Sequence, residues 1–174
     1  MNTKIADVVA GRAGLAGVQW ALLGAPARRA LRRALRTLLD DPGLLGPCGL
    51  RRAKYKPGRH LTAYYDVHLR SKDGTGAGVR PIEVTWTPEG TDDPRGPLPE
   101  RLRMQAEALG CGLAAPFRQL MAEALPWGMR VQVAPLDITF PQLVRVSDPA
   151  CVRAMLARAA ATADHAPAAD PAPR

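Results

Sequence analysis

Hydrophobic and polar residues alternate with a period of two in the middle of the chain. Within Leu61–Leu69 every second residue is apolar and the residues between are mostly polar, and Val79–Thr87 largely repeats the pattern. Alternation of this kind predicts half-buried strands. The Gly-rich segment Ser71–Gly78 between them is typical of a hairpin turn. With a shorter apolar run at Leu50–Tyr55, the pattern predicts a three-stranded antiparallel meander.

The stretch before the meander has helical spacing instead. Leu31, Leu35 and Leu38 recur at intervals of three and four, which places them on one face of a helix. Pro26 suits the first turn of this helix, and the Asp-Asp-Pro-Gly run that begins at Asp40 predicts its end. We therefore expect an N-terminal helical extension over residues 1–43.

Helices are also expected after the meander. In Pro99–Leu109 the spacing predicts that Leu102, Ala106 and Leu109 face the core. The other expected elements are a helix over Pro116–Leu125, a strand over Met129–Ala134, an irregular stretch over Pro135–Ser147 and a helix over Pro149–Ala161. Because strands and helices are grouped rather than alternating, the sequence predicts an α+β fold with an antiparallel sheet and flanking helices.

Length and composition fit one domain. At about 150 residues per domain, 174 residues predict a single folded unit. We expect the α+β domain to span residues 44–159, followed by an Ala- and Pro-rich disordered tail over residues 160–174. No apolar run resembles a signal peptide or a membrane span. Three widely separated cysteines, Cys48, Cys111 and Cys151, are typical of a reduced chain, so we expect a cytoplasmic protein without a membrane partner.

The positive charge is concentrated in one region. The formal net charge is +8, and residues 28–59 hold ten basic and two acidic side chains. The basic side of the expected helix carries Arg28, Arg29, Arg32, Arg33 and Arg36. Such a cluster could bind the phosphates of nucleic acid or another polyanion. A helix face that is simply exposed to solvent, without a ligand, explains the same cluster of arginines.

The most distinctive motif runs from Arg52 to Tyr65 and reads RAKYKPGRHLTAYY. It resembles the turn between the first two strands in the N-terminal lobe of the aminoglycoside-phosphotransferase-like (protein-kinase-like) family, particularly uncharacterised bacterial members. Later segments that also resemble this family begin at Val133 (VAPLD), Pro141 (PQL) and Ser147 (SDP). The resemblance covers roughly residues 30–157.

This resemblance implies a kinase-like N-terminal lobe in which the first hairpin covers the phosphates of ATP. Carried over by position, the cofactor-binding residues would be Lys56, Gly58 and Arg59. Glycine would let the backbone approach the ligand closely, and the two cations would neutralise its charge. The implied cofactor is ATP with Mg²⁺, provided that a partner supplies a catalytic lobe.

Two departures from the family count against catalysis by this chain. Kinases carry a Lys on the third strand that pairs with a helix Glu, whereas Thr85 stands at about that position here, and Glu100 or Glu107 would lack the partner. We also find no His-x-Asp catalytic loop and no motif for a metal-binding Asp. We therefore assign no catalytic residue.

A protein-held metal is not expected either. His60, His68, His165 and the cysteines lack the paired spacing of zinc ligands.

The sequence thus predicts a phosphotransferase-related protein: a stand-alone ATP-covering lobe that acts with a separate catalytic chain or is inactive. The alternative is a basic module that binds nucleic acid or another polyanion. Where a kinase lobe would normally meet its catalytic lobe, we expect an exposed apolar face covered by a protein partner or by self-association.

Overall fold

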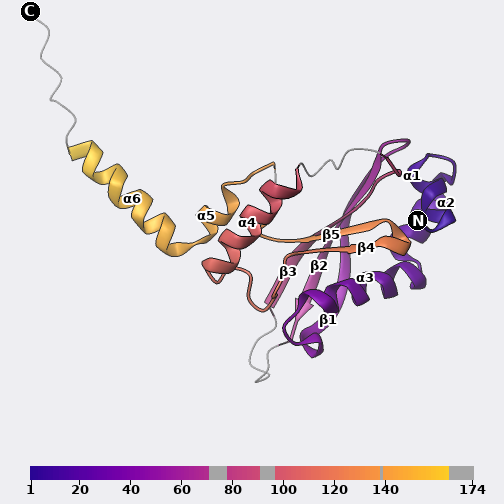
Figure 1. Cartoon of the computed structure of the whole chain (residues 1–174), viewed down its shortest axis with the longest axis horizontal. Helices are drawn as coiled ribbons and strands as arrows, with labels where there is room; N and C mark the ends of the chain where they lie inside the picture. Colours follow the sequence, from indigo (N-terminus) through magenta and orange to yellow (C-terminus); the bar gives the residue numbers. More distant parts are fainter. Residues whose placement is uncertain (71–77, 91–96, 138, 165–174) are drawn as a thin grey trace, which may run out of the picture.

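The protein combines one antiparallel sheet with helices on several sides (Figure 1). The computed structural model describes residues 1–70, 78–90, 97–137 and 139–164. In chain order the elements are α1 (Thr3–Val9), α2 (Gly14–Leu23), α3 (Ala25–Leu38), η1 (Pro42–Leu44), β1 (Leu45–Lys56), β2 (His60–Leu69), β3 (Gly78–Trp86), α4 (Leu98–Gly110), β4 (Met121–Ala124), η2 (Leu125–Trp127), β5 (Met129–Val133), α5 (Leu143–Ser147) and α6 (Pro149–Asp164). The predicted α+β class is confirmed. No helix in the described ranges has both the length and the apolar character needed to cross a bilayer.

The five strands lie in the order β1-β2-β3-β5-β4, and every neighbouring pair is antiparallel. The predicted pairing of the second and third strands is confirmed, with Leu61 opposite Trp86 and Leu69 opposite Gly78. Most of the turn expected between these strands, residues 71–77, lies outside the described residues. β1 is longer than the expected run and begins at Leu45.

The two faces of the sheet differ in chemistry because alternate residues point to opposite sides. On one face Ala63, Val84 and Val131 are adjacent across three strands and fully buried. The apolar side of α3 is buried within the same core cluster. The other face carries a row of polar residues, including the neighbouring pair Thr62 and Thr85. The polar face is therefore the side of the sheet that can offer polar groups to a ligand.

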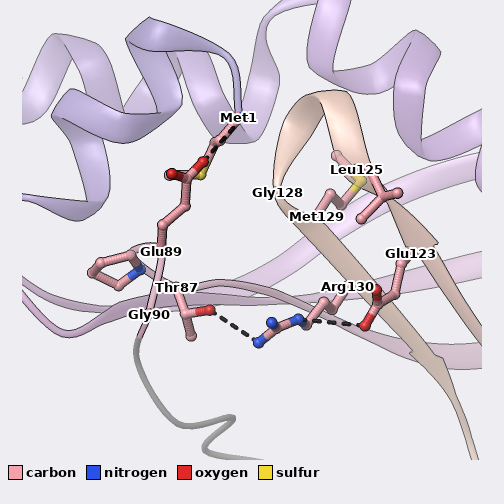
Figure 2. A pocket seen from close by; sticks show the side chains of 10 residues that line it. Met1, Thr87, Glu89, Gly90, Glu123, Leu125, Gly128, Met129 and Arg130 are labelled. Atoms are coloured by element: carbon pink, nitrogen blue, oxygen red, sulfur yellow. Dashed lines mark hydrogen bonds and ion pairs between the residues drawn. The ribbon is translucent and has the colours of Figure 1, made fainter.

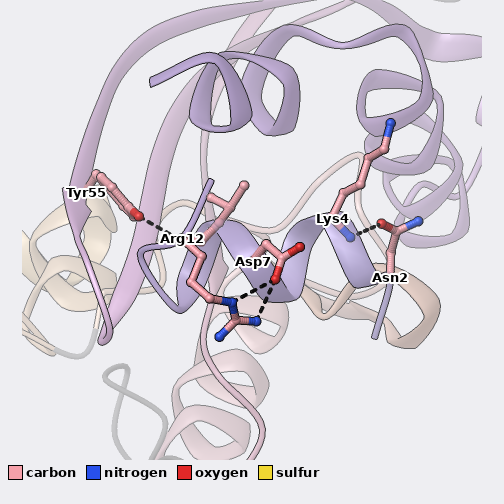
Figure 3. Close-up of polar contacts among 6 residues, drawn as sticks. Asn2, Lys4, Asp7, Arg12 and Tyr55 are labelled. Carbon is pink, nitrogen blue, oxygen red and sulfur yellow. Dashed lines mark hydrogen bonds and ion pairs between the residues drawn. The ribbon is translucent and has the colours of Figure 1, made fainter. Parts of the chain in front are cut away.

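The N-terminal helices share their core with the sheet. Ile5 and Val8 of α1 belong to the same buried cluster as the strand residues. The Tyr55 hydroxyl of β1 donates to the Val8 carbonyl at 2.6 Å, while Arg12 pairs with Asp7 beside it (Figure 3). These contacts hold the end of α1 against the first hairpin.

Two predictions after the meander are wrong. The segment 116–125 is not a helix, because Met121–Ala124 forms β4 and pairs with β5. Gly128 closes this hairpin with a φ of 55°, a left-handed conformation that favours glycine. In α4 the side chains expected in the core are exposed, with Leu102 at 48% and Leu109 at 39%, whereas the opposite side of the helix is buried.

The C-terminal part extends away from the sheet (Figure 1). α5 forms within the stretch that we expected to be irregular, and α6 continues to Asp164, past the expected end at Ala161. Met155 and Leu156 on α6 are 52% and 65% exposed. The remainder of the expected tail, residues 165–174, lies outside the described residues.

Candidate functional site

A cleft of about 340 Å³ opens on the polar face of the sheet, beside the β1–β2 hairpin. We call it the hairpin cleft. Side chains from β1, β2, β3, β5 and the loop after β5 line it: Lys54, Lys56, His60, Thr62, Tyr64, Glu83, Thr85, Gln132, Asp137 and Thr139. Antiparallel pairing brings these residues together from distant parts of the sequence, since Lys54 lies opposite Thr62 and Thr62 opposite Thr85.

Three buried polar side chains belong to this cleft. Thr62 is 8%, Thr85 1% and Gln132 4% exposed. The Thr85 hydroxyl donates to Glu83 at 3.2 Å, and the Gln132 side-chain amide donates to the Leu136 carbonyl at 2.7 Å. The other polar atom of the Gln132 side chain, Oε1, is buried and has no hydrogen-bond partner among the described residues. A buried acceptor without a hydrogen-bond partner lowers the stability of the fold. A ligand that donates a hydrogen bond to this oxygen would remove that cost.

The hairpin side of the cleft is positively charged. Lys54 and Lys56 are exposed, and the half-buried His60 lies opposite Lys56 in the pairing of β1 with β2. Partial burial, then the charges of Lys56, Lys54 and Arg59, lower the pKa of His60 below its ordinary value of 6.5. The imidazole is therefore mainly neutral at pH 7, and an anion bound beside it would favour its protonated form.

The other side of the cleft is acidic and aromatic. Glu83 and Asp137 supply carboxylates, and the Arg52 guanidinium stacks on the Tyr64 ring at 4.3 Å from its centroid. Partial burial and the neighbouring Glu83 raise the pKa of the Tyr64 hydroxyl, so it stays protonated at neutral pH. The cleft therefore suits a ligand with an anionic end and hydrogen-bond donors at the other.

The structure divides the three residues predicted to bind a cofactor. Lys56 lines the cleft, whereas Gly58 and Arg59 do not. The Gly58 N–H donates to the Val9 carbonyl at 2.9 Å, and the Arg59 N–H donates to the Lys56 carbonyl at 3.0 Å. Because both backbone donors are already used within the protein, they are not available to phosphates in this conformation. Gly58 is instead required by the turn, where its φ is 72°.

Sequence reasoning missed the residues that surround Lys56. Lys54, His60 and Thr62 lie within six positions of it and share its side of the sheet. Alternation along each strand could have placed them on one face. Adding Gln132 from β5 required the strand order, which the sequence does not reveal.

The five arginines predicted to bind a polyanion are not equivalent. Arg32 is half-buried and donates to the Gly46 carbonyl at 2.7 Å, so it helps to hold α3 against β1. The other four, Arg28, Arg29, Arg33 and Arg36, are exposed and form no ion pair within the described ranges. They make a stripe along the solvent side of α3, and we call them the α3 arginines.

The two helix carboxylates considered as partners for a strand lysine are used elsewhere. Glu107 pairs with Arg145 at 3.0 Å, and Glu100 lies 3.8 Å from Arg103. Neither glutamate lines the hairpin cleft. Thr85, at the position where a kinase would carry lysine, donates its hydroxyl within the sheet instead.

A second cavity, of about 230 Å³, lies beside the turn between β4 and β5 (Figure 2). Its charged groups pair with one another: the Met1 amino group is 3.2 Å from Glu89, and Arg130 is 3.5 Å from Glu123. Since these charges are satisfied within the protein, the cavity has less to offer a charged ligand than the hairpin cleft.

The donors needed to hold a metal are not gathered in the part of the chain that the structure describes. No group of three or more His, Cys, Asp or Glu side chains lies together there. Comparisons of the chain with protein-family models, with curated proteins and with solved structures found no match.

Proposed function

We propose that this protein is a phosphotransferase-related lobe that binds the phosphates of a nucleotide in the hairpin cleft. The observation that carries the proposal is the convergence of Lys54, Lys56 and His60 beside the buried hydroxyls of Thr62 and Thr85. The family resemblance of the Arg52–Tyr65 motif supports it, because that motif forms the hairpin next to the cleft.

The chemistry of the cleft favours a nucleotide over a simple anion. Lysine ammonium groups and hydroxyls bind phosphate oxygens. Gln132 Oε1 would accept a hydrogen bond from an amino group of the base, and its orientation follows from the bond that Gln132 Nε2 makes to Leu136. A ligand with phosphates at one end and an amino-bearing base at the other would satisfy both sides of the cleft.

Phosphoryl transfer by this chain alone is not part of the proposal. Transfer requires a group that positions the nucleophile and residues that hold Mg²⁺, and the sequence carries no kinase motif for either role. The lobe would cover ATP for a separate catalytic chain or would be an inactive relative. Any Mg²⁺ would arrive with the nucleotide.

Calorimetric titration with ATP–Mg²⁺, tripolyphosphate and adenosine tests the proposal. The double substitution Lys54→Gln, Lys56→Gln should weaken ATP binding by about 10-fold or more, since two charge-assisted contacts are removed. The matched control Arg28→Gln, Arg29→Gln removes the same charge from α3 and should leave ATP binding unchanged. Equal affinities for both variants would refute the cleft as the site. ATP turnover that Lys56→Ala abolishes would refute the non-catalytic role.

A second candidate function rests on the α3 arginines. Four exposed guanidinium groups without acidic partners in the described ranges could bind a nucleic acid backbone or another polyanion. In this case RNA binding should weaken steeply with salt, and Arg28→Gln, Arg33→Gln, Arg36→Gln should reduce that salt dependence. The cleft variant Lys54→Gln, Lys56→Gln should bind RNA as the unchanged protein does.

A further inference from the structure

β4 is an edge strand: among the described residues it pairs with β5 on one side and with no strand on the other. The Val133 N–H donates to the Leu120 carbonyl at 2.8 Å, and this bond fixes the alternation along the hairpin. Two positions on, Ala122 also directs its backbone groups toward β5. The N–H and C=O groups of Met121 and Glu123 therefore point away from the sheet, and no hydrogen bond in the described ranges reaches them.

Open space borders this edge. α3 packs against β4 (Figure 1), and a groove of about 410 Å³ lies between the two elements. Small side chains line it, namely Ala30 and Ala34 from α3 with Ala122 and Ala124 from β4. Another hollow, of about 310 Å³, lies between β4 and α4. A further strand therefore has room beside β4, and the alanines leave space for its side chains.

The α3 side of the groove is positively charged. Arg33 lines the groove, is exposed and forms no ion pair within the described ranges. Arg29 and Arg36 lie four positions before and three positions after it, so the helical repeat places them on the same side of α3. On the β4 side, the Glu123 carboxylate is already paired with Arg130 at 3.5 Å. An acidic side chain that enters the groove would therefore meet an unpaired cation.

We propose that the β4 edge binds an extended segment of another protein, with small apolar and acidic side chains facing α3. Exposed sheet edges accept peptides in this way, as an additional strand. The outward groups of Met121 and Glu123 would supply backbone hydrogen bonds, and the groove would accept every second side chain. A second copy of this chain fits less well, because each copy carries a net charge of +8 and the same arginines.

Fluorescence anisotropy of a labelled, acetylated peptide of sequence VTVTETE, titrated with the full chain, tests the proposal. The valines and glutamates of this peptide share one face of an extended strand. We expect saturable binding that Arg33→Gln weakens by about 3-fold, since one exposed ion pair is lost. The matched control Arg28→Gln removes the same charge from a position outside the groove and should leave the affinity unchanged. The peptide VTVTKTK, which carries lysines in place of the glutamates, should bind more weakly than VTVTETE.

Substitutions at Glu123 separate backbone pairing from side-chain contacts. Glu123→Pro removes the outward N–H, and proline is tolerated where the N–H of an edge strand faces away from the sheet. Glu123→Gln removes the same carboxylate but keeps the N–H. We expect Glu123→Pro to weaken peptide binding by about 10-fold and Glu123→Gln to leave it nearly unchanged. Circular dichroism verifies that both variants are folded.

N-methylation of alternate peptide residues provides a test that leaves the protein unchanged. Because only one of the two alternating sets of N–H groups faces β4, methylation of that set should abolish binding and methylation of the other set should not. Equal effects of the two methylated peptides, equal affinities of the two Glu123 variants, tighter binding of VTVTKTK, or no binding at millimolar peptide would each overturn the proposal. The cleft variant Lys54→Gln, Lys56→Gln should bind the peptide normally, which separates this surface from the nucleotide site.

Discussion

The pKa of His60 depends on the charge of the hairpin cleft, because neighbouring cations add to the effect of its partial burial. Its pKa lies below the ordinary value of 6.5, owing to partial burial and to Lys56, Lys54 and Arg59. We expect Lys54→Gln, Lys56→Gln to raise this pKa toward 6.5, and Arg28→Gln, Arg29→Gln to leave it unchanged. Titration of the imidazole resonances by NMR measures both effects. A His60 pKa that does not move in the lysine variant would mean that these lysines point away from the cleft in solution.

The same residue gives the stability of the fold a pH dependence with a definite sign. Because the pKa of His60 is lower in the folded chain than in the unfolded one, the unfolded state binds more protons as the pH falls. Its contribution to stability is complete above the unfolded pKa of about 6.5 and is lost as the pH falls through the folded value. In urea unfolding between pH 7 and pH 5, His60→Gln should therefore lose less stability than the unchanged protein.

Single residues also show what the sequence could and could not predict about the site. The motif identified Lys56 and the glycine turn, but the structure assigns Gly58 to the turn and not to the ligand. Arg80 went unnoticed. Its guanidinium donates to the carbonyls of Leu113 at 3.2 Å and Ala115 at 2.6 Å, and burial lowers its pKa. Nothing local distinguishes such an anchor from any other strand arginine, because its partners come from a distant loop.

Among the elements, α3 has both a structural and an exposed set of arginines, and the two can be separated. Arg32 donates to Gly46 of β1 at 2.7 Å, whereas its neighbour Arg33 is exposed. We expect Arg32→Ala to lower the free energy of unfolding by about 1 kcal/mol, since it removes a charged donor from a partly buried carbonyl. Arg33→Ala should change stability by less than about 0.5 kcal/mol. Equal losses for both variants in urea unfolding would contradict the assignment.

The elements that the sequence predicts well are those whose periodicity is long and clear. β2, β3 and α3 each carry apolar residues on a buried side and mostly polar residues on the other, so alternation or helical spacing was sufficient to find them. The prediction of a helix over residues 116–125 was wrong because the apolar residues there fit helical spacing, whereas pairing with β5 decides the conformation. For α4 the helix was predicted but its buried side was wrong. It carries apolar residues on both sides, and only the packing reveals that Met104 and Ala108 are the buried ones.

At the scale of the whole molecule, apolar side chains are exposed along the C-terminal elements. α4 presents Leu98 at 54% and Leu102 at 48% exposure, and α6 presents Met155 and Leu156. Phe140 and Val146, 62% and 51% exposed, lie in the stretch between these helices. Monomeric proteins seldom expose more than a few hundred Å² of contiguous apolar surface. Burial of these side chains against another chain would remove them from water and favour association.

We therefore expect the isolated protein to self-associate, and sedimentation velocity over a range of concentrations measures this. Leu102→Glu, Leu156→Glu should shift the protein toward the monomer without unfolding it, because both side chains are already exposed. The charge-reversal variant Arg28→Glu, Arg33→Glu, Arg36→Glu is the matched control. It changes the α3 arginines and should leave the association intact if the contact is apolar. A monomer at tens of micromolar without a partner would contradict the prediction. If only the arginine variant dissociates, the interface lies on α3 instead.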